Sequence, residues 1–503
     1  MKNLFAKLYR FFCSWFFLKI VLWIATLIVL FYVEEDWRGA RAWAATKTKW
    51  EAQGELFDIN RFIPSPIPDD QNLAAIPLFD QTPVNGVMTP VALQKALRSN
   101  QPEIQLPSTG GWQSGKLPDL QKIRSSLATN YNQVFHSAPP NKAIDQLEAL
   151  YPFMADLRAA SAARPYCQFK IDQSNPLPAA WPFELLTRQI LLSKILTLHA
   201  VLALDEHQPD LAMEDIKVNF KLISGMKHNP MVVTGLIGIG MTGITLTVVY
   251  DGLAWHAWND TQLADLENAL DALDFLENYQ QCMRGEVISE VVPNMEYFKS
   301  HQSDVTLTLD FWFRPGANRY STYSTWPNGW LDLNLSRIVD RDLSSIKGTN
   351  PKEHRVFPDY ADKLENDALR LRAHWYGYLP WNILFTASAP EILKNVSAFA
   401  QIQVWIDQAR VVCALERYRL THGAYPATLD ELVPSYITEP PHDIIDGQPY
   451  RYQVRPDNTF LLYSIGWNQI DDKGKTVYKK DQPAMLDFRQ GDWVWPVHPP
   501  AVK

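Results

Sequence analysis

The sequence predicts an α+β protein with a single N-terminal transmembrane helix, a mainly helical body in the form of a bundle or short solenoid, and a C-terminal domain that joins a long helix to a small antiparallel sheet. Three observations predict this architecture. Residues 11–33 are almost all apolar, residues 141–284 repeat apolar side chains at helical spacing, and residues 450–464 alternate apolar and polar side chains around a turn. With 503 residues, 47% of them hydrophobic and 20% charged, the chain is long enough for several globular domains.

The apolar run at residues 11–33 predicts a transmembrane helix, because about 20 apolar residues in a helix cross the hydrocarbon core of a bilayer. Lys19 lies within the run, and we expect its side chain to reach toward the cytoplasmic headgroups. The tail at residues 1–10 is basic, whereas residues 34–36 are acidic. The positive-inside rule therefore places the N-terminus in the cytoplasm and the bulk of the chain outside the inner (cytoplasmic) membrane.

A cleaved signal peptide is the alternative for this segment, because residues 42–44 form an A-x-A pattern. The pattern lies well beyond the apolar run and behind charged residues, unlike a signal-peptide cleavage site, so we expect the helix to remain as an anchor.

The exported cysteines, Cys167, Cys282 and Cys413, are too widely spaced to indicate a disulfide framework or a metal pair. An oxidising compartment would still allow one bridge among them.

The two segments after the anchor differ in composition. Residues 34–54 continue the helical pattern as a stalk, with Gly54 placed to end the helix. Residues 55–140 are predicted to form a proline-rich strap. The repeated prolines of residues 62–86 disfavour a helix or a central strand and favour an extended path over the body.

The body at residues 141–292 is predicted to be a helical domain, with proline, Asn or Asp signals between its helices. Asn259 offers an N-cap to the last helix, which carries leucines along one face. Residues 231–250 carry no charge and are only weakly apolar. They form either a buried bundle helix, the interpretation that we favour, or a second membrane span. The predicted helical blocks are 141–163, 182–205, 209–226, 231–254 and 260–284.

Residues 293–388 form an aromatic-rich connector, in which Trp, Tyr and Phe stand among prolines and glycines. Large aromatic side chains bury much of their surface, so we expect this connector to cover or join the neighbouring domains. A face that binds carbohydrate or a partner protein is the alternative.

The C-terminal domain at residues 389–503 is predicted to open with a long helix. Ser388 and Glu391 form a capping box at its start, and Gly423 supplies the left-handed residue that ends it. Apolar side chains recur at steps of three and four residues, which predicts one buried face. This stripe consists of Ile392, Val396, Phe399, Ile402, Ile406, Ala409 and Cys413.

A short helix and an antiparallel hairpin follow the long helix. Thr428 and Glu431 form a second capping box, and Pro434 stops the short helix that it opens. The segments YRYQVR and TFLLYS, at residues 450–455 and 459–464, then read as two strands joined by a turn.

Residues 397–495 resemble the soluble domain of type II secretion pseudopilins, especially the major, G-type pseudopilin. The segments that carry the resemblance are LERYRLTHGAYPATLDELVP, PHDIIDGQPYRYQV, LLYSIGWNQIDDKG and GDWVW, in that order. The membrane segment departs from the family, since FFCSWFFLKIVLW lacks the leader, the Gly cleavage site and the Phe-Thr-Leu-x-Glu start. We therefore expect a pseudopilin-like domain that is attached to a different anchored body and does not stack like a pilin subunit.

The resemblance also implies a calcium site. In G-type pseudopilins the loop after the Tyr-Ser-x-Gly strand is associated with calcium, a hard cation that takes six to eight oxygen ligands. The corresponding candidate ligands are Asp471, Asp472, Asp487 and Asp492. The alternative is a solvated acidic turn, because several lysines lie close to these residues in the sequence.

Other chemistry finds little support in the sequence. A net charge of −8 excludes a broad basic surface, so we expect no nucleic-acid partner. The segment at residues 110–116 has P-loop spacing but Leu117 at the hydroxyl position, and residues 238–243 have G-x-G-x-x-G spacing without the strand-to-helix context. We expect no nucleotide. The eleven histidines show no metal-ligand or nucleophile spacing, and the adjacent His442–Asp443 pair reads as a satisfied or solvated surface pair.

These observations favour a membrane-anchored extracytoplasmic protein that is not an enzyme and that acts as a scaffold or accessory factor, through protein contacts, in a secretion-type or envelope assembly. An envelope hydrolase is one alternative, with a site between the helical body and the connector to which His354, His374 or His442 contributes. A calcium-stabilised binding module is another.

Overall fold

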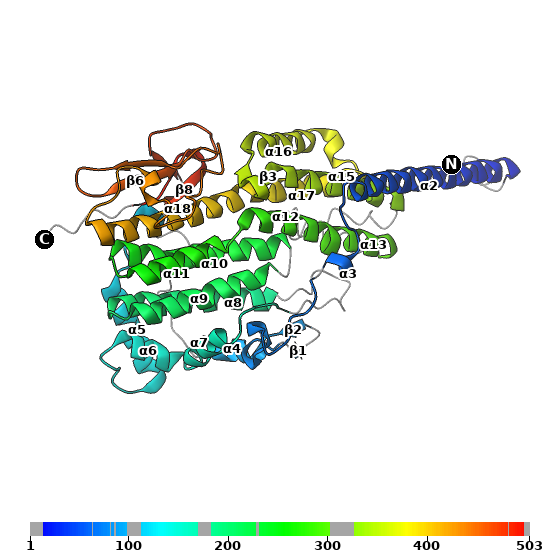
Figure 1. Ribbon diagram of the computed structural model, residues 1–503. Helices are drawn as coiled ribbons and strands as arrows, with labels where there is room; N and C mark the ends of the chain where they lie inside the picture. Colours follow the sequence, from blue (N-terminus) through cyan, green and yellow to red (C-terminus); the bar gives the residue numbers. More distant parts are fainter. Residues whose placement is uncertain are drawn as a thin grey trace. The chain divides into compact units, whose positions relative to one another are not determined.

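The structure is a computed structural model of a mostly helical chain with small antiparallel sheets (Figure 1). It describes residues 14–62, 64–80, 82–84, 87–97, 112–169, 183–227, 231–301, 326–480 and 482–496. The chain divides into two compact units. The first, which we call the anchor unit, contains Met1–Ile59, Val287–Asp342 and Glu365–Glu391. The second, the core unit, contains Asn60–Glu286, Leu343–Leu364 and Ile392–Lys503.

The anchor unit begins with α2 (Trp15–Glu51), one helix of 37 residues that runs from the apolar segment into the predicted stalk (Figure 1). Ser14 caps its first turn by accepting a hydrogen bond from the Phe17 amide, and the chain turns away through Gly54, whose φ is 91°. In the most apolar window of α2 no residue is buried, so this helix is a candidate membrane anchor. The basic tail and Cys13 lie outside the described residues.

The start of α15 (Asn328–Ser345) packs against α2 through two glycines. A Cβ on Gly39 would overlap the backbone of Gly329, and a Cβ on Gly329 would overlap the backbone carbonyl of Glu35. Two of the three acidic residues after the apolar run bind α15. The Asp36 carboxylate accepts a hydrogen bond of 2.8 Å from the Gly329 amide, and the Glu35 carboxylate accepts one of 2.8 Å from the Trp330 indole.

The described part of the predicted aromatic connector is mainly helical. Asn334 on α15 is fully buried, and its carboxamide accepts hydrogen bonds from the Leu384 and Phe385 amides at the start of α17. Some aromatic residues of this region pack on one another, as Trp330 does on Trp381, whereas Trp375 and Tyr378 are exposed. The element η5 (Val287–Val291) directly precedes this region. Its other elements are α13 (Val292–Ser300), η7 (Ile346–Gly348), β3 (Thr349–Asn350), η8 (Pro351–Glu353), β4 (Arg355–Val356), α16 (Pro358–Ala373), η9 (Trp375–Tyr378) and α17 (Ile383–Leu393).

The core unit is built on helices that pack side by side (Figure 1). The predicted block at residues 209–226 is confirmed as α9, whereas the block at 141–163 is interrupted around Pro152 and the block at 260–284 around Leu273. The leucine stripe predicted on the last block is buried. The helices are α5 (Leu120–Phe135), α6 (Ala143–Leu150), α7 (Met154–Ala163), α8 (Phe183–Asp205), α9 (Pro209–Met226), α10 (Val232–Ala254), α11 (Asp260–Asp271) and α12 (Phe275–Glu286).

The helix α10 is mostly buried among its neighbours α8, α9, α12 and α18 (Asn395–His422). Three described helices are long and apolar enough to cross a membrane, namely α2, α8 and α10. In α8 and α10, 72% of the apolar window is buried within the protein, against none in α2. This contrast favours the buried bundle helix over the second membrane span at residues 231–250.

The segment predicted as a proline-rich strap also contains regular structure. The long helix α5, at Leu120–Phe135, lies within it, because an Asp119 cap and a proline-free run of helix-forming residues follow Pro118. The strap is therefore wrong as a description of residues 55–140 as a whole. Its other elements are α3 (Ile59–Phe62), η1 (Leu73–Ala75), η2 (Pro77–Phe79), β1 (Thr82–Val84), β2 (Val87–Thr89), α4 (Val91–Leu97) and η3 (Trp112–Ser114).

The C-terminal region has one long helix, α18 (Asn395–His422), followed by short antiparallel strands. Gly423, with φ of 76°, ends α18 as predicted. The predicted hairpin is confirmed, with Arg451 opposite Tyr463 and Val454 opposite Phe460. A three-stranded sheet has the order β5-β6-β9, and β7 pairs with β8. The elements are η10 (Leu429–Leu432), β5 (Arg451–Val454), β6 (Phe460–Ser464), β7 (Thr476–Lys479), β8 (Gln482–Gly491) and β9 (Trp493–Val494).

Two details of the predicted long helix are wrong. The capping box at Ser388 does not open it, since Ser388 lies within α17 and its hydroxyl donates to the Leu384 carbonyl. The helix also does not bury a single stripe. Between Val396 and Glu416 nearly every side chain is buried, because α10, α11, α12 and β6 pack around α18. Polar residues such as Gln401 and Asp407 are buried along with the apolar ones.

Candidate functional site

A polar cavity of about 600 Å³ lies in the core unit beside α18. Helix α11, the turn after η8 and the segment that follows η10 supply its walls. The lining is acidic, with five carboxylates against one lysine and one arginine. The charged and histidine residues that line it are Glu267, Asp271, Asp274, Lys352, Glu353, His354, Arg410, Glu439 and His442.

His354 and Asp407 form a hydrogen-bonded pair in this cavity. The turn after η8 places His354 in the left-handed region, with φ of 49°, and its Nε2 lies 2.9 Å from the Asp407 carboxylate. Asp407 is fully buried on α18 and also accepts hydrogen bonds from Tyr450 Oη (3.2 Å) and Gln403 Nε2 (2.9 Å). The orientation of Gln403 is fixed in turn, because its carboxamide oxygen accepts from the Phe275 amide. The carboxylate is therefore held in place by three partners.

Two opposing effects act on the protonation of His354. Burial lowers its pKa, but the neighbouring Asp407 carboxylate favours the imidazolium, and the net result is a raised pKa. His354 Nδ1 has no hydrogen-bond partner among the described residues. An imidazole that is oriented by a buried carboxylate through one nitrogen and open at the other can accept or donate a proton near neutral pH.

The other two histidines named as candidates differ in their positions. His442 reaches the same cavity. Its Nε2 donates to the Glu353 carbonyl, and its ring lies 5.7 Å from that of His354. His374 belongs to the anchor unit and does not line this cavity. Sequence reasoning missed Asp407, Gln403 and Tyr450. One signal in the sequence could have indicated Asp407, because it is a lone acidic residue within the apolar stretch of a helix that was predicted to be buried.

Asp443 is not a surface residue, contrary to the surface interpretation of the His442–Asp443 pair. Its carboxylate is fully buried and accepts hydrogen bonds from the Ile445 amide (3.1 Å), the Ile465 amide (3.0 Å) and the Ser464 hydroxyl (2.8 Å). These bonds tie the segment before β5 to the end of β6. Asp443 is therefore a structural residue that is satisfied by its neighbours.

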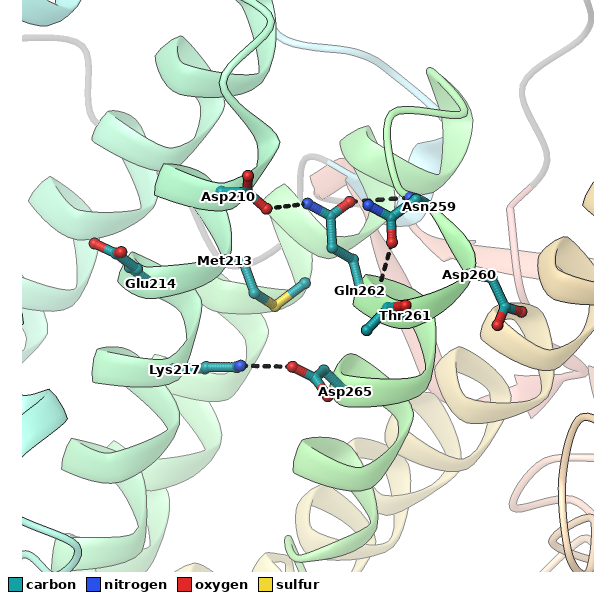
Figure 2. A pocket seen from close by; sticks show the side chains of 9 residues that line it. All are labelled: Asp210, Met213, Glu214, Lys217, Asn259, Asp260, Thr261, Gln262 and Asp265. Atoms are coloured by element: carbon teal, nitrogen blue, oxygen red, sulfur yellow. Dashed lines mark hydrogen bonds and ion pairs between the residues drawn. The ribbon is translucent and has the colours of Figure 1, made fainter.

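A second cavity, of about 540 Å³, lies between α9 and α11 (Figure 2). Figure 2 shows that its polar side chains bind one another: Gln262 donates to Asp210 at 2.6 Å, and Lys217 binds Asp265 at 2.8 Å. Asn259 and Gln262 also form the capping box that starts α11. These groups join two helices and cap one of them, so we prefer the His354 cavity as the functional candidate.

The acidic turn named as a calcium site brings together some of its four predicted ligands. The Asp492 carboxylate accepts hydrogen bonds from the Asp472 and Gly474 amides, at 3.2 and 2.6 Å. Asp471 instead binds Tyr463 and Lys473, and Asp487 accepts from a nearby amide on β8. Within the described ranges, no group of three or more His, Cys, Asp or Glu side chains is arranged to hold a metal ion. Calcium binding stays a prediction, which a calcium titration that follows the melting temperature would test.

The glycine-rich and cysteine motifs have structural roles. The G-x-G-x-x-G segment lies in the middle of α10, so it does not form the strand-to-helix turn of a dinucleotide site. In the P-loop-like segment, Trp112 is fully buried against Trp405 and Trp495. The three described cysteines are unpaired and buried, and burial raises the pKa of the Cys167 thiol to about 12.

Replacing His354 by glutamine should lower the free energy of unfolding more at a pH of about 5.5 than at about 8.5. Because the folded state raises the pKa of His354, the contribution of its charged form is fully present below the unfolded pKa, about 6.5, and is lost as the pH rises through the folded value. A hydrogen bond to a charged partner contributes about 1.5–3 kcal/mol, which sets the expected loss at low pH. Thermal unfolding of the detergent-solubilised chain at both pH values measures the difference.

His422 provides the control for this prediction, because it is exposed at the end of α18 and does not bind a carboxylate among the described residues. His422→Gln should change the stability little, and by the same amount at both pH values. If the His354 variant loses the same free energy of unfolding at both pH values, the charge on the imidazole does not contribute to stability.

Comparison with protein-family models, with curated proteins and with solved structures found no match for the chain. Its function is therefore inferred from its own residues and their arrangement.

Proposed function

We propose that this protein is a membrane-anchored scaffold or accessory factor of a secretion-type or envelope assembly, and that it acts through protein contacts made by its extracytoplasmic part. In this proposal α2 crosses the inner membrane once, with the N-terminus in the cytoplasm. The C-terminal region serves as a pseudopilin-like domain.

The observation that carries the proposal is the order of elements after residue 395. A long helix ends at Gly423, the short η10 follows, and the antiparallel strands β5, β6 and β9 complete the region. This order is the one that the resemblance to G-type pseudopilins implies. The exposed apolar window of α2 supports the anchor, because a helix whose apolar side chains face outward needs a nonaqueous environment.

Affinity purification of the full chain from detergent-solubilised membranes, after cross-linking in cells, tests the scaffold role. We expect secretion or envelope-assembly proteins to be recovered with the full chain and to be lost when residues 395–503 are deleted. Recovery of the same proteins with and without this region would contradict a role for the pseudopilin-like domain. Protease added to intact spheroplasts tests the topology, and it should cleave the C-terminal region without lysis.

Hydrolysis in the His354 cavity is the second candidate function, favoured by the His354–Asp407 pair. In this reaction His354 Nδ1 takes a proton from water, the resulting hydroxide attacks an ester or amide carbonyl, and the imidazolium returns the proton to the leaving group. Release of p-nitrophenol from p-nitrophenyl acetate by the purified chain measures this activity. The activity should disappear in His354→Ala and persist in His422→Ala, and equal rates for both variants would exclude this site.

A further inference from the structure

The turn formed by η9 exposes a group of aromatic side chains in the anchor unit. Trp375 is 76% exposed, Tyr376 38% and Tyr378 57%, which are high values for residues of this size. They follow one another within the sequence His-Trp-Tyr-Gly-Tyr, and the ring centroids of Trp375 and Tyr376 lie 6.0 Å apart. An exposed aromatic patch of this kind marks a contact surface.

The backbone of this turn is fixed to α15 and α17. The Asn382 carboxamide donates to the Tyr376 carbonyl, and the Thr386 hydroxyl donates to the Gly377 carbonyl. The Asn334 carboxamide of α15 donates to the Pro380 carbonyl at 2.8 Å. The aromatic side chains are therefore carried by a rigid support.

That support meets α2 where its apolar run ends. Trp330 lies 5.5 Å from Trp381 and 6.0 Å from Phe31, measured between ring centroids. The Arg38 guanidinium lies 5.8 Å from the centroid of Trp381. From Val33, the last apolar residue of the run, to Arg38 the helix rises about 8 Å, and the headgroup layer on each side of a bilayer is roughly 5–8 Å thick. The support of the turn thus lies at the depth of the lipid headgroups.

The side chains directly before the turn are also of a kind that binds in the lipid headgroup layer. Arg370, which is 80% exposed and lies 3.8 Å from the exposed Asp367 carboxylate, and Arg372 occupy the last turn of α16, directly before the aromatic residues. Trp and Tyr are enriched at membrane interfaces because their rings are apolar and their N–H and O–H groups are polar. Arginines beside them are attracted to the phosphates of anionic lipids.

We propose that the η9 turn is a second membrane contact. Trp375, Tyr376 and Tyr378 insert into the headgroup layer of the leaflet from which α2 emerges, and Arg370 and Arg372 bind anionic phospholipid there. The contact fixes the angle between α2 and the membrane and holds the anchor unit against the bilayer. It rests on the proposed role of α2 as a membrane anchor.

Spin-label depth measurements on the full chain test this contact, with α2 as an internal ruler. Nitroxides are attached one at a time at Trp375→Cys and Tyr378→Cys in the chain reconstituted into phosphatidylethanolamine and phosphatidylglycerol vesicles. Val29→Cys marks the hydrocarbon core, and Lys47→Cys marks water about 20 Å beyond the end of the apolar run, at 1.5 Å of rise per residue. Cys13 is replaced by serine, and the buried Cys167, Cys282 and Cys413 are left in place.

Collision rates with oxygen and with a water-soluble nickel complex give the depth of each label. We expect the labels at residues 375 and 378 to lie between the two reference positions, with nickel accessibility several-fold below that of residue 47. Labels at residues 375 and 378 that are as accessible to nickel as the label at residue 47 would overturn the proposal. Labels shielded from both oxygen and nickel would also overturn it, because they would indicate a protein partner. If residue 29 is itself open to nickel, α2 does not span the bilayer and the anchor proposal fails instead.

A charge variant tests the lipid component. In the double variant Arg370→Gln, Arg372→Gln the label at residue 375 should move toward water. The same shift is expected when both arginines are present and the vesicles contain phosphatidylcholine alone. Glu51→Gln is the matched control, because it removes an exposed charge from the same unit at the far end of α2. The same shift in the control would contradict specific binding of anionic lipid by these arginines.

Discussion

Replacing Gly329 by valine should separate α15 from α2 and leave the anchor unit sensitive to protease. The two backbones are so close at Gly39 and Gly329 that a side chain on either has no room, and backbone atoms cannot move aside as a flexible side chain can. Separation also removes the bonds from Asp36 to the Gly329 amide and from Glu35 to the Trp330 indole. Overpacking costs about 1–3 kcal/mol and each of the two hydrogen bonds to a charged group about 1.5–3 kcal/mol, so we expect a loss of roughly 4–9 kcal/mol.

Thermal unfolding and limited proteolysis of the detergent-solubilised chain measure this loss. Gly240→Ala is the matched control, since a Cβ at that position of α10 meets no atom within 4 Å. Alanine is a better helix former than glycine by about 1 kcal/mol, so the control should be unchanged or slightly stabilised. Wild-type melting of Gly329→Val would show that α2 and α15 are not in close contact.

Replacing Asp443 by alanine should destabilise the β5-β6-β9 sheet. The buried carboxylate accepts hydrogen bonds from two amides and a hydroxyl, and Arg451 lies 3.5 Å away. Removal leaves these donors buried without a partner, and each buried donor left unsatisfied costs about 1–3 kcal/mol. Hydrogen exchange at the Ile465 amide reports the change directly, because that amide donates to Asp443 at 3.0 Å.

The control for Asp443 is Asp430, an exposed acid in η10 of the same unit. Asp430→Ala should leave the exchange of the sheet amides close to that of the wild type. If Asp443→Ala also leaves the exchange of the Ile465 amide unchanged, the sheet does not depend on this carboxylate.

Local signals in the sequence predicted many elements of the fold, because capping residues and periodicity act within a few residues. The Asn259 cap of α11, the Gly423 end of α18 and the hairpin at residues 451–464 are examples. The capping box at Ser388 failed because the same residue pattern is compatible with a position inside a helix, where serine bonds back to its own helix. The helices of the aromatic connector were missed because prolines and glycines lie between them and in their first turns, as Pro293, Gly329 and Pro358 do, and weaken the periodic signal.

The candidate site was predictable only in part. His354 and His442 were named from the sequence, but nothing in it brings His354 to Asp407, which is 53 residues away. Their contact depends on how the η8 turn packs against α18, and that packing is a property of the whole core unit. The role of Gln403 as an orienting group is hidden for the same reason.

The burial of α18 on all sides restricts how copies of this chain can polymerise. Subunits that assemble into a fibre through a long helix must present that helix to the next subunit, whereas the described part of α18 already has its neighbours within its own polypeptide. Growth of a filament along this helix would require the core unit to unfold first. Contacts between copies must therefore use surfaces other than the buried stretch of α18 between Val396 and Glu416.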